Sequence, residues 1–197
     1  MISDTKVVAI GGGTGLSTML KGLKLHTHNI TAVVTVADDG GSSGILRSDL
    51  GMLAPGDVRN CVSALAEVDP VMGELLNFRF KDGSLKGHSL GNLFLAALNE
   101  TSSSFDEAVK KFSHLAGVVG TVYPVTNESV TLSALLEDGR LIEGESHIGV
   151  HHDGPKNGIV KLMVNPEKPK AVDGVIKALE KADIIVLGPG SLYTSII

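Results

Sequence analysis

The sequence has few aromatic residues and no excess of basic ones, and both shortages exclude a class of protein. It contains five Phe, two Tyr and no Trp, too few for the stacked aromatic side chains on which single-stranded nucleic acids bind. With 17 Lys and Arg against 22 Asp and Glu, the formal net charge is −5, which argues against a broad interface with a phosphate backbone. We therefore expect no nucleic-acid partner.

Cysteine and long hydrophobic runs are also scarce. One Cys excludes an internal disulfide framework and a Cys-based zinc site. No apolar run approaches the length of about 18 residues that a membrane span needs. The chain does not begin with a basic segment followed by a long apolar stretch, as a secretory signal would. The sequence predicts a cytoplasmic protein without a membrane span.

What the sequence has in abundance is glycine, with 24 residues among 197. The length and the 43% hydrophobic content suit a single α/β domain over residues 1–197. The last glycine-rich segment ends at Ser191, and the chain stops at Ile197, which leaves too few residues for a stable terminal helix. We therefore expect an incomplete domain, with further strands and helices beyond residue 197.

Hydrophobic periodicity predicts the fold class. A β-branched run, a helical pattern and a second β-branched run form a βαβ unit, which predicts a Rossmann-like, doubly wound, mostly parallel sheet. Helical spacing in the middle of the chain predicts a helical insert, and an Asp-Gly turn at 137–140 predicts a β-hairpin. The expected strands are 6–10, 30–36, 130–136, 141–147, 159–164 and 183–187. The expected helices are 16–23, one from 57, 88–99, one that follows a capping box of Ser104 and Glu107, and 172–179.

The first glycine loop carries the strongest chemical signal. It follows the first strand and precedes the first helix, so its backbone N–H groups and the positive end of the helix dipole favour a phosphate. The spacing departs from the dinucleotide fingerprint, whose third glycine falls on Leu16, and the Lys of a P-loop is missing. We expect this loop to bind the phosphates of a nucleotide or diphosphate through Gly11, Gly12, Gly13, Thr14 and Gly15.

A second candidate loop follows the second strand. The carboxyl ends of neighbouring strands share one crevice in a doubly wound sheet, so Asp38 and Asp39 should lie near the first loop. They could hold a ribose hydroxyl, or they could bind Mg²⁺ shared with a diphosphate. The loop continues to residue 44, longer than a simple turn, and Ser42 and Ser43 would supply hydroxyl donors.

Two further polar groups lie at expected helix starts. Asp57 is interpreted as an N-cap, while Arg59 and Asn60 lie off the apolar face of the helix, where Arg59 could pair with a phosphate. His88 and Asn92 are four residues apart on an expected helix and therefore share a face. They form either a satisfied hydrogen bond in the core or a ligand-facing pair.

The last glycine turn repeats the pattern of the first, and Gly188, Gly190 and Ser191 could line the same crevice. Cys61 lies on an apolar helical face and is interpreted as a buried residue rather than a nucleophile. A zinc site is a weak alternative at the histidine cluster, because an extended segment would separate its members. That cluster consists of His147, His151, His152 and Asp153.

Five motifs in order resemble the YvcK, or gluconeogenesis factor, branch of the CofD-like superfamily. They are IGGGTGL at 10–16, VADDGGSSG at 36–44, APGDVRN at 54–60, GHSLGN at 87–92 and LGPGSLYTS at 187–195. The resemblance implies a Rossmann-like fold in a cytoplasmic bacterial protein that is longer than this chain. It also implies binding of a UDP-sugar, notably UDP-N-acetylglucosamine, and a role in cell shape and envelope synthesis during gluconeogenic growth.

The resemblance leaves two enzymatic alternatives. CofD enzymes transfer a phospholactyl group from a guanosine diphosphate donor to a deazaflavin with Mg²⁺, but the segment 55–60 differs from the enzyme pattern. A tubulin-like GTPase is suggested by residues 11–15 and disfavoured by their position early in the chain. We expect a ligand-binding regulator without catalytic residues, with Mg²⁺ and NAD as candidate cofactors. A regulatory protein partner and a homo-oligomer stay open.

Overall fold

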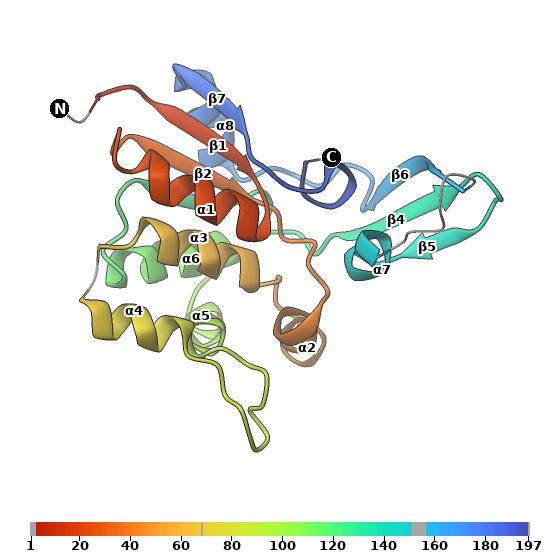
Figure 1. Ribbon diagram of the computed structural model, residues 1–197, viewed down its shortest axis with the longest axis horizontal. Helices are drawn as coiled ribbons and strands as arrows, with labels where there is room; N and C mark the ends of the chain where they lie inside the picture. Colours follow the sequence, from red (N-terminus) through yellow and green to blue (C-terminus); the bar gives the residue numbers. More distant parts are fainter. Residues whose placement is uncertain (1–2, 68, 151–156, 197) are drawn as a thin grey trace.

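A four-stranded parallel sheet forms the centre of the computed structural model, which describes residues 3–67, 69–150 and 157–196. The strand order is β3-β2-β1-β7, and Figure 1 shows β2, β1 and β7 side by side. Because β1 lies between β2 and β7, the chain adds strands first on one side of β1 and later on the other. This arrangement is the topological switch point of a doubly wound sheet. The strands are β1 (Val7–Gly11), β2 (Ile30–Val34), β3 (Thr121–Pro124) and β7 (Ile184–Leu187).

Eight α-helices lie within the described part of the chain. All run between eight and eleven residues except α7, which has six. A π-helical turn, η2 (Leu192–Ile196), follows the last strand. The helices are α1 (Gly13–Leu23), α2 (Gly41–Leu50), α3 (Gly56–Leu65), α4 (Pro70–Asn77), α5 (Leu90–Glu100), α6 (Phe105–Leu115), α7 (Glu145–Val150) and α8 (Asp173–Lys181).

Helices cover both faces of the parallel sheet, because alternate strand residues point to opposite sides. Ala9 and Ala32 belong to the main core, which also takes the apolar faces of α1, α3 and α6. Val8 and Val33, next to them along the strands, pack with Val175 of α8 in a smaller second core. The doubly wound α/β fold class is therefore confirmed.

A second, antiparallel sheet lies beside the carboxyl ends of the parallel strands (Figure 1). Its order is β5-β4-β6, and its strands are β4 (Thr131–Leu136), β5 (Leu141–Glu143) and β6 (Ile159–Asn165). The turn between β4 and β5 is closed where the N–H of Leu136 donates to the carbonyl of Arg140 over 2.9 Å. The hairpin and its turn at 137–140 are as predicted.

The glycine-serine segment after β2 is the main difference from the expected elements. It was expected to be a loop up to Gly44, but α2 begins at Gly41, and β2 ends at Val34 rather than at residue 36. Glycine and serine have low helix propensity, so the sequence hides this helix. Tertiary contacts stabilise it, since Ser42, Ser43 and Leu46 are buried.

Other element boundaries also needed correction. His88 precedes α5, whose N-cap is Ser89, so the helical spacing assumed for His88 was wrong. The capping box is absent in the expected form, because Glu107 accepts the N–H of Ser103 over 2.8 Å and Ser104 bonds to Asp106 instead. The helix α4 was not predicted from the sequence pattern.

The second hairpin strand is shorter than expected. It ends at Glu143, because Gly144 has a φ of 94°, a conformation that breaks a strand and suits glycine. His147 therefore lies in α7, where its Nδ1 bonds to the carbonyl of Glu143 at 2.8 Å. The other members of the histidine cluster, residues 151–153, lie outside the described residues.

Candidate functional site

The first and last glycine turns meet at the switch point of the sheet. The N–H of Gly188 donates to the carbonyl of Ile10 over 2.6 Å, which joins the ends of β7 and β1. A Cβ atom on Gly15 would lie 2.1 Å from the carbonyl oxygen of Pro189, so only glycine permits this approach. The structure therefore brings together the two turns that were predicted to line one crevice.

Asp57 lies directly over the first glycine turn. It is the second residue of α3, whose N-cap position is Pro55, so its interpretation as an N-cap was wrong. Its carboxylate instead accepts the backbone N–H of Gly13. A Cβ atom on Gly12 would lie 3.0 Å from Asp57 Oδ2. One of the backbone donors expected to bind phosphate is thus already paired within the protein.

Carboxylates from three segments lie close enough for their charges to affect one another's pKa values. Burial, followed by the charge of Asp38, raises the pKa of Asp57 from 3.8 to about 6. Burial, followed by the charges of Asp38 and Asp57, raises the pKa of Glu145 from 4.5 to about 7, although Thr194 donates a hydrogen bond to it. This acidic region attracts cations, and the carboxyl groups of Asp57 and Glu145 are partly protonated near neutral pH because their pKa values are raised.

Asp39 has a different environment from Asp38. Its Oδ1 accepts the N–H of Ser146 over 2.8 Å, and a Cβ atom on Gly144 would lie 2.4 Å from its Oδ2. Asp38 Oδ1 accepts the N–H of Gly40 over 2.9 Å. Asp39 thus connects the segment after β2 to the helix α7, whereas Asp38 faces the crevice.

A polar cavity of about 210 Å³ opens beside Asp57. Most of the polar residues predicted from the middle of the chain line it, together with Arg79, which was not predicted. Its side-chain lining is Asp38, Ser42, Ser43, Asp57, Arg59, Asn60, Arg79 and Asn92.

A buried hydrogen-bond network supports the wall of this polar cavity. Ser42 Oγ lies 2.9 Å from His88 Nδ1 and accepts from Asn92 Nδ2 over 3.1 Å. Arg59 donates from Nε to Asn92 Oδ1 over 3.3 Å and from Nη1 to Asn77 Oδ1 over 2.8 Å. His88 and Asn92 thus meet at Ser42, although they do not share a helical face.

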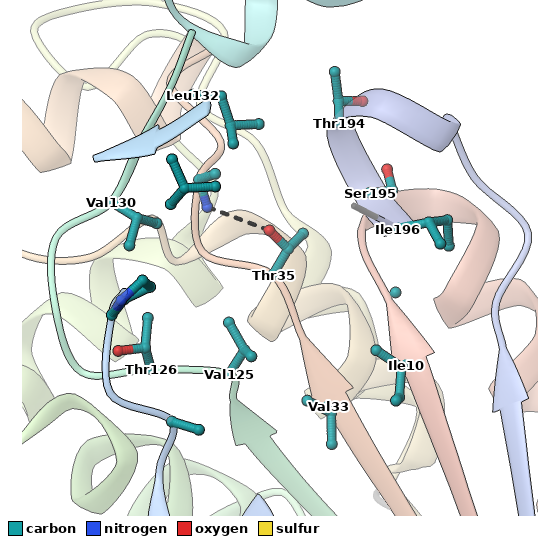
Figure 2. A pocket seen from close by; sticks show the side chains of 15 residues that line it. Ile10, Val33, Thr35, Val125, Thr126, Val130, Leu132, Thr194, Ser195 and Ile196 are labelled. Atoms are coloured by element: carbon teal, nitrogen blue, oxygen red, sulfur yellow. Dashed lines mark hydrogen bonds between the residues drawn. The ribbon is translucent and has the colours of Figure 1, made fainter. Parts of the chain in front are cut away.

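A second, apolar cavity of about 210 Å³ is lined in part by Gly11 of the glycine turn. Figure 2 shows it between the ends of β1, β2 and β3, represented by Ile10, Val33 and Val125, and the segment that carries Thr194 and Ser195. Most of its lining is aliphatic, including Val130, Leu132 and Val164. Small apolar cavities with a few hydroxyl groups at the edge suit the flat, weakly polar part of a ligand.

The residues that would hold Mg²⁺ are limited in number. Within residues 3–67, 69–150 and 157–196, no three His, Cys, Asp or Glu side chains converge as a metal-holding group. Mg²⁺ often uses one or two carboxylates and completes its shell with phosphate oxygens and water. Asp38 and Asp57, both at the polar cavity, fit that arrangement better than Asp38 with Asp39.

Several other candidate residues do not line either of these two cavities. Thr14, Gly190 and Ser191 are exposed near the glycine turns. Cys61 is fully buried, as interpreted, and burial raises the pKa of its thiol.

No helix in the described chain is long and apolar enough to cross a membrane.

Four residues of the site were missed as candidates from the sequence: Asp57, Arg79, Glu145 and Thr194. Asp57 and Thr194 lie within motifs that were noticed, so their position beside glycine turns was an available signal. Arg79 and Glu145 come from segments without a motif. Only the three-dimensional fold brings them to the crevice.

Fold and site together define a Rossmann-like α/β protein whose crevice lies between two glycine turns. Comparison with protein families agrees, because the model described as 2-phospho-L-lactate transferase CofD matches residues 7–197. The chain belongs to the CofD family, in the branch of the gluconeogenesis factors. This membership leaves the tubulin-like GTPase alternative without support.

Similar proteins share both sequence and fold with the chain. A Thermoanaerobacterium thermosulfurigenes protein named "Putative gluconeogenesis factor" is 57% identical over 196 residues, covering 100% of this chain and 61% of the relative. The "Gluconeogenesis factor" of Bacillus subtilis (strain 168) is 47% identical over 195 residues, covering 98% and 60%. The crystal structure of protein BH3568 from Bacillus halodurans matches with a TM-score of 0.93 and 45% identity, covering 98% and 61%. The chain thus spans less than two thirds of these relatives.

Proposed function

We propose that this chain forms the nucleotide-sugar site of a gluconeogenesis factor, a regulator that binds a UDP-N-acetylglucosamine-type ligand without converting it. The observation that carries the proposal is the pair of cavities near the glycine turn, an apolar one lined by Gly11 of the turn and a polar one lined by Asp57, which lies next to Gly12. A nucleotide sugar has the same division, with a flat base, a diphosphate and a hydroxyl-rich sugar. Through such binding the protein would regulate cell shape and envelope synthesis during gluconeogenic growth.

Specific residues would take the parts of this ligand. The base would enter the apolar cavity, and the amino end of α1, with Thr14 and Gly15, would face the diphosphate. Asp38 would hold a ribose or sugar hydroxyl, or Mg²⁺ shared with the diphosphate. When bound, Mg²⁺ would supply charge neutralisation for the phosphates.

Calorimetric titration with UDP-N-acetylglucosamine in the presence of Mg²⁺ tests the proposal. We expect saturable binding that Thr14→Ala or Asp38→Ala weakens by about 1–3 kcal/mol, the usual cost of an unmatched polar partner. Thr18→Ala is the matched control, because Thr18 lies one turn further along α1 and its hydroxyl bonds only to the carbonyl of Thr14, at 2.8 Å. Equal affinity in both test variants, with circular dichroism unchanged, would place the ligand elsewhere.

A CofD-like transferase is the second candidate function. The observation in its favour is the description of the matching family model. Saturating guanosine diphosphate donor and deazaflavin acceptor with Mg²⁺ should then give a phospholactyl transfer product. Absence of product together with UDP-sugar binding favours the regulator. If the UDP-sugar does not bind, guanosine diphosphates and NAD are the next ligands to titrate.

A further inference from the structure

Arg59 is a buried cation with no ion pair within 4.0 Å in the described part of the chain, although the charge of Asp57 acts on it from a greater distance. Its side chain is 7% exposed, and its two hydrogen bonds go to neutral amide oxygens of Asn92 and Asn77. In the part of the chain that the structure describes, ion pairs within 4.0 Å involve only Lys111 with Glu107 and Arg140 with Asp138. Burying a charge without a close counter-ion is costly, and a bound anion would offset that cost.

A second arginine lies beside the first and increases this cost. Burial, followed by the positive charge of Arg79, lowers the pKa of Arg59, and the charge of Asp57 opposes this shift in part. Arg59 and Arg79 both line the polar cavity. Arg79 is anchored by a hydrogen bond from its Nη1 to the carbonyl of Gly87. Two like charges held at one cavity are typical of a site that receives an anion.

The amino end of α2 contributes to the same cavity. Gly41, Ser42 and Ser43, the first three residues of this ten-residue helix, line the polar cavity with the arginines. The first N–H groups of a helix lack intrahelical partners and favour negative charge. At the glycine turn, by contrast, the N–H of Gly13 is already bonded to Asp57.

We propose that the polar cavity is an oxyanion site of its own, in which Arg59 and Arg79 bind a phosphate group against the amino end of α2. Asn92 and Asn77 hold the guanidinium of Arg59 toward the cavity, so they are positioning residues. Asp38 and Asp57 line the same cavity, which allows a divalent cation to bridge the phosphate to the carboxylates. The phosphate belongs either to the nucleotide ligand or to a separate phosphate compound.

Titration of the protein with inorganic phosphate and pyrophosphate tests this site without any nucleotide. We expect pyrophosphate binding that Arg79→Gln weakens by about tenfold, the usual scale for one charge-assisted hydrogen bond. Because Arg79 is exposed at the rim, this variant should stay folded, and Arg59→Lys provides a second test that keeps the charge but loses the fork geometry. Arg140→Gln is the control, since Arg140 pairs with Asp138 at the hairpin turn.

Competition identifies the source of the phosphate. If saturating UDP-N-acetylglucosamine blocks pyrophosphate binding, the site takes the diphosphate of the nucleotide; if both bind together, it takes a separate phosphate compound. Repeating the titration in EDTA and in Mg²⁺ shows whether a cation bridge is required. The inference is overturned if neither probe saturates in either buffer, or if Arg79→Gln binds pyrophosphate as tightly as the unaltered protein. Pyrophosphate binding without UDP-sugar binding would instead refute only the proposed function.

Discussion

The carboxyl of Asp57 should make the protein less stable as the pH rises, and Asp57→Asn should remove that loss. Burial and the charge of Asp38 raise its pKa from 3.8 to about 6. The folded protein therefore binds this proton more tightly than the unfolded chain, and the stabilisation is complete below pH 3.8 and is lost as the pH rises to about 6. Since a tenfold change in proton affinity corresponds to about 1.4 kcal/mol, the loss amounts to about 3 kcal/mol.

Urea unfolding at several pH values between about 4 and about 7.5 measures this effect. The free energy of unfolding of Asp57→Asn, relative to the unaltered protein, should increase across this range by up to about 3 kcal/mol, because an Asn oxygen can still accept the N–H of Gly13. Asp49→Asn is the control, since Asp49 is exposed at the end of α2, and its effect should stay within about 0.5 kcal/mol. Parallel pH profiles for Asp57→Asn and the unaltered protein would refute the reasoning.

Two further predictions concern the same crevice. Gly15→Ala should lower the free energy of unfolding by about 1–3 kcal/mol, because its Cβ would lie 2.1 Å from the backbone oxygen of Pro189; Gly22→Ala on the same helix, with no atom within 4 Å, should raise it by about 0.5–1 kcal/mol. Chemical denaturation of both variants checks this, and equal effects would contradict the close approach. Glu145→Gln should gain stability over the unaltered protein as the pH rises from about 4.5 to about 7, since the pKa of Glu145 is raised to about 7; a pH-independent difference would show that this carboxyl is not buried as described.

The sequence predicts best where local pattern and fold agree. The glycine turns at residues 11 and 188 follow β-branched strands, so the switch point and its crevice follow from the chain order alone. The helix α2 was missed because its serine and glycine residues favour loops, whereas tertiary contacts, among them the burial of Ser42, Ser43 and Leu46, stabilise the helix.

Individual site residues were harder to predict, because their partners come from distant segments. Asp57 has the local pattern of an N-cap, yet its carboxylate pairs with Gly13. Asp38 and Asp39 are adjacent in sequence, but Asp39 pairs with Ser146 in α7. Local spacing cannot separate the roles of such neighbours, since the difference depends on contacts about a hundred residues away. The binding roles of the candidate residues stay predictions.

The position of β7 next to β1 also has a consequence for how the crevice forms during folding. The N–H of Lys6 donates to Asp183 across a sequence separation of 177 residues, and β1 pairs with Ile184–Leu187 in the same region. Contacts of such long range close late, because a large loop entropy opposes them. During synthesis, the first glycine turn therefore emerges long before its partner, and the crevice becomes complete only when nearly the whole described chain has been made. A ligand that needs both turns would bind only chains that have reached this stage.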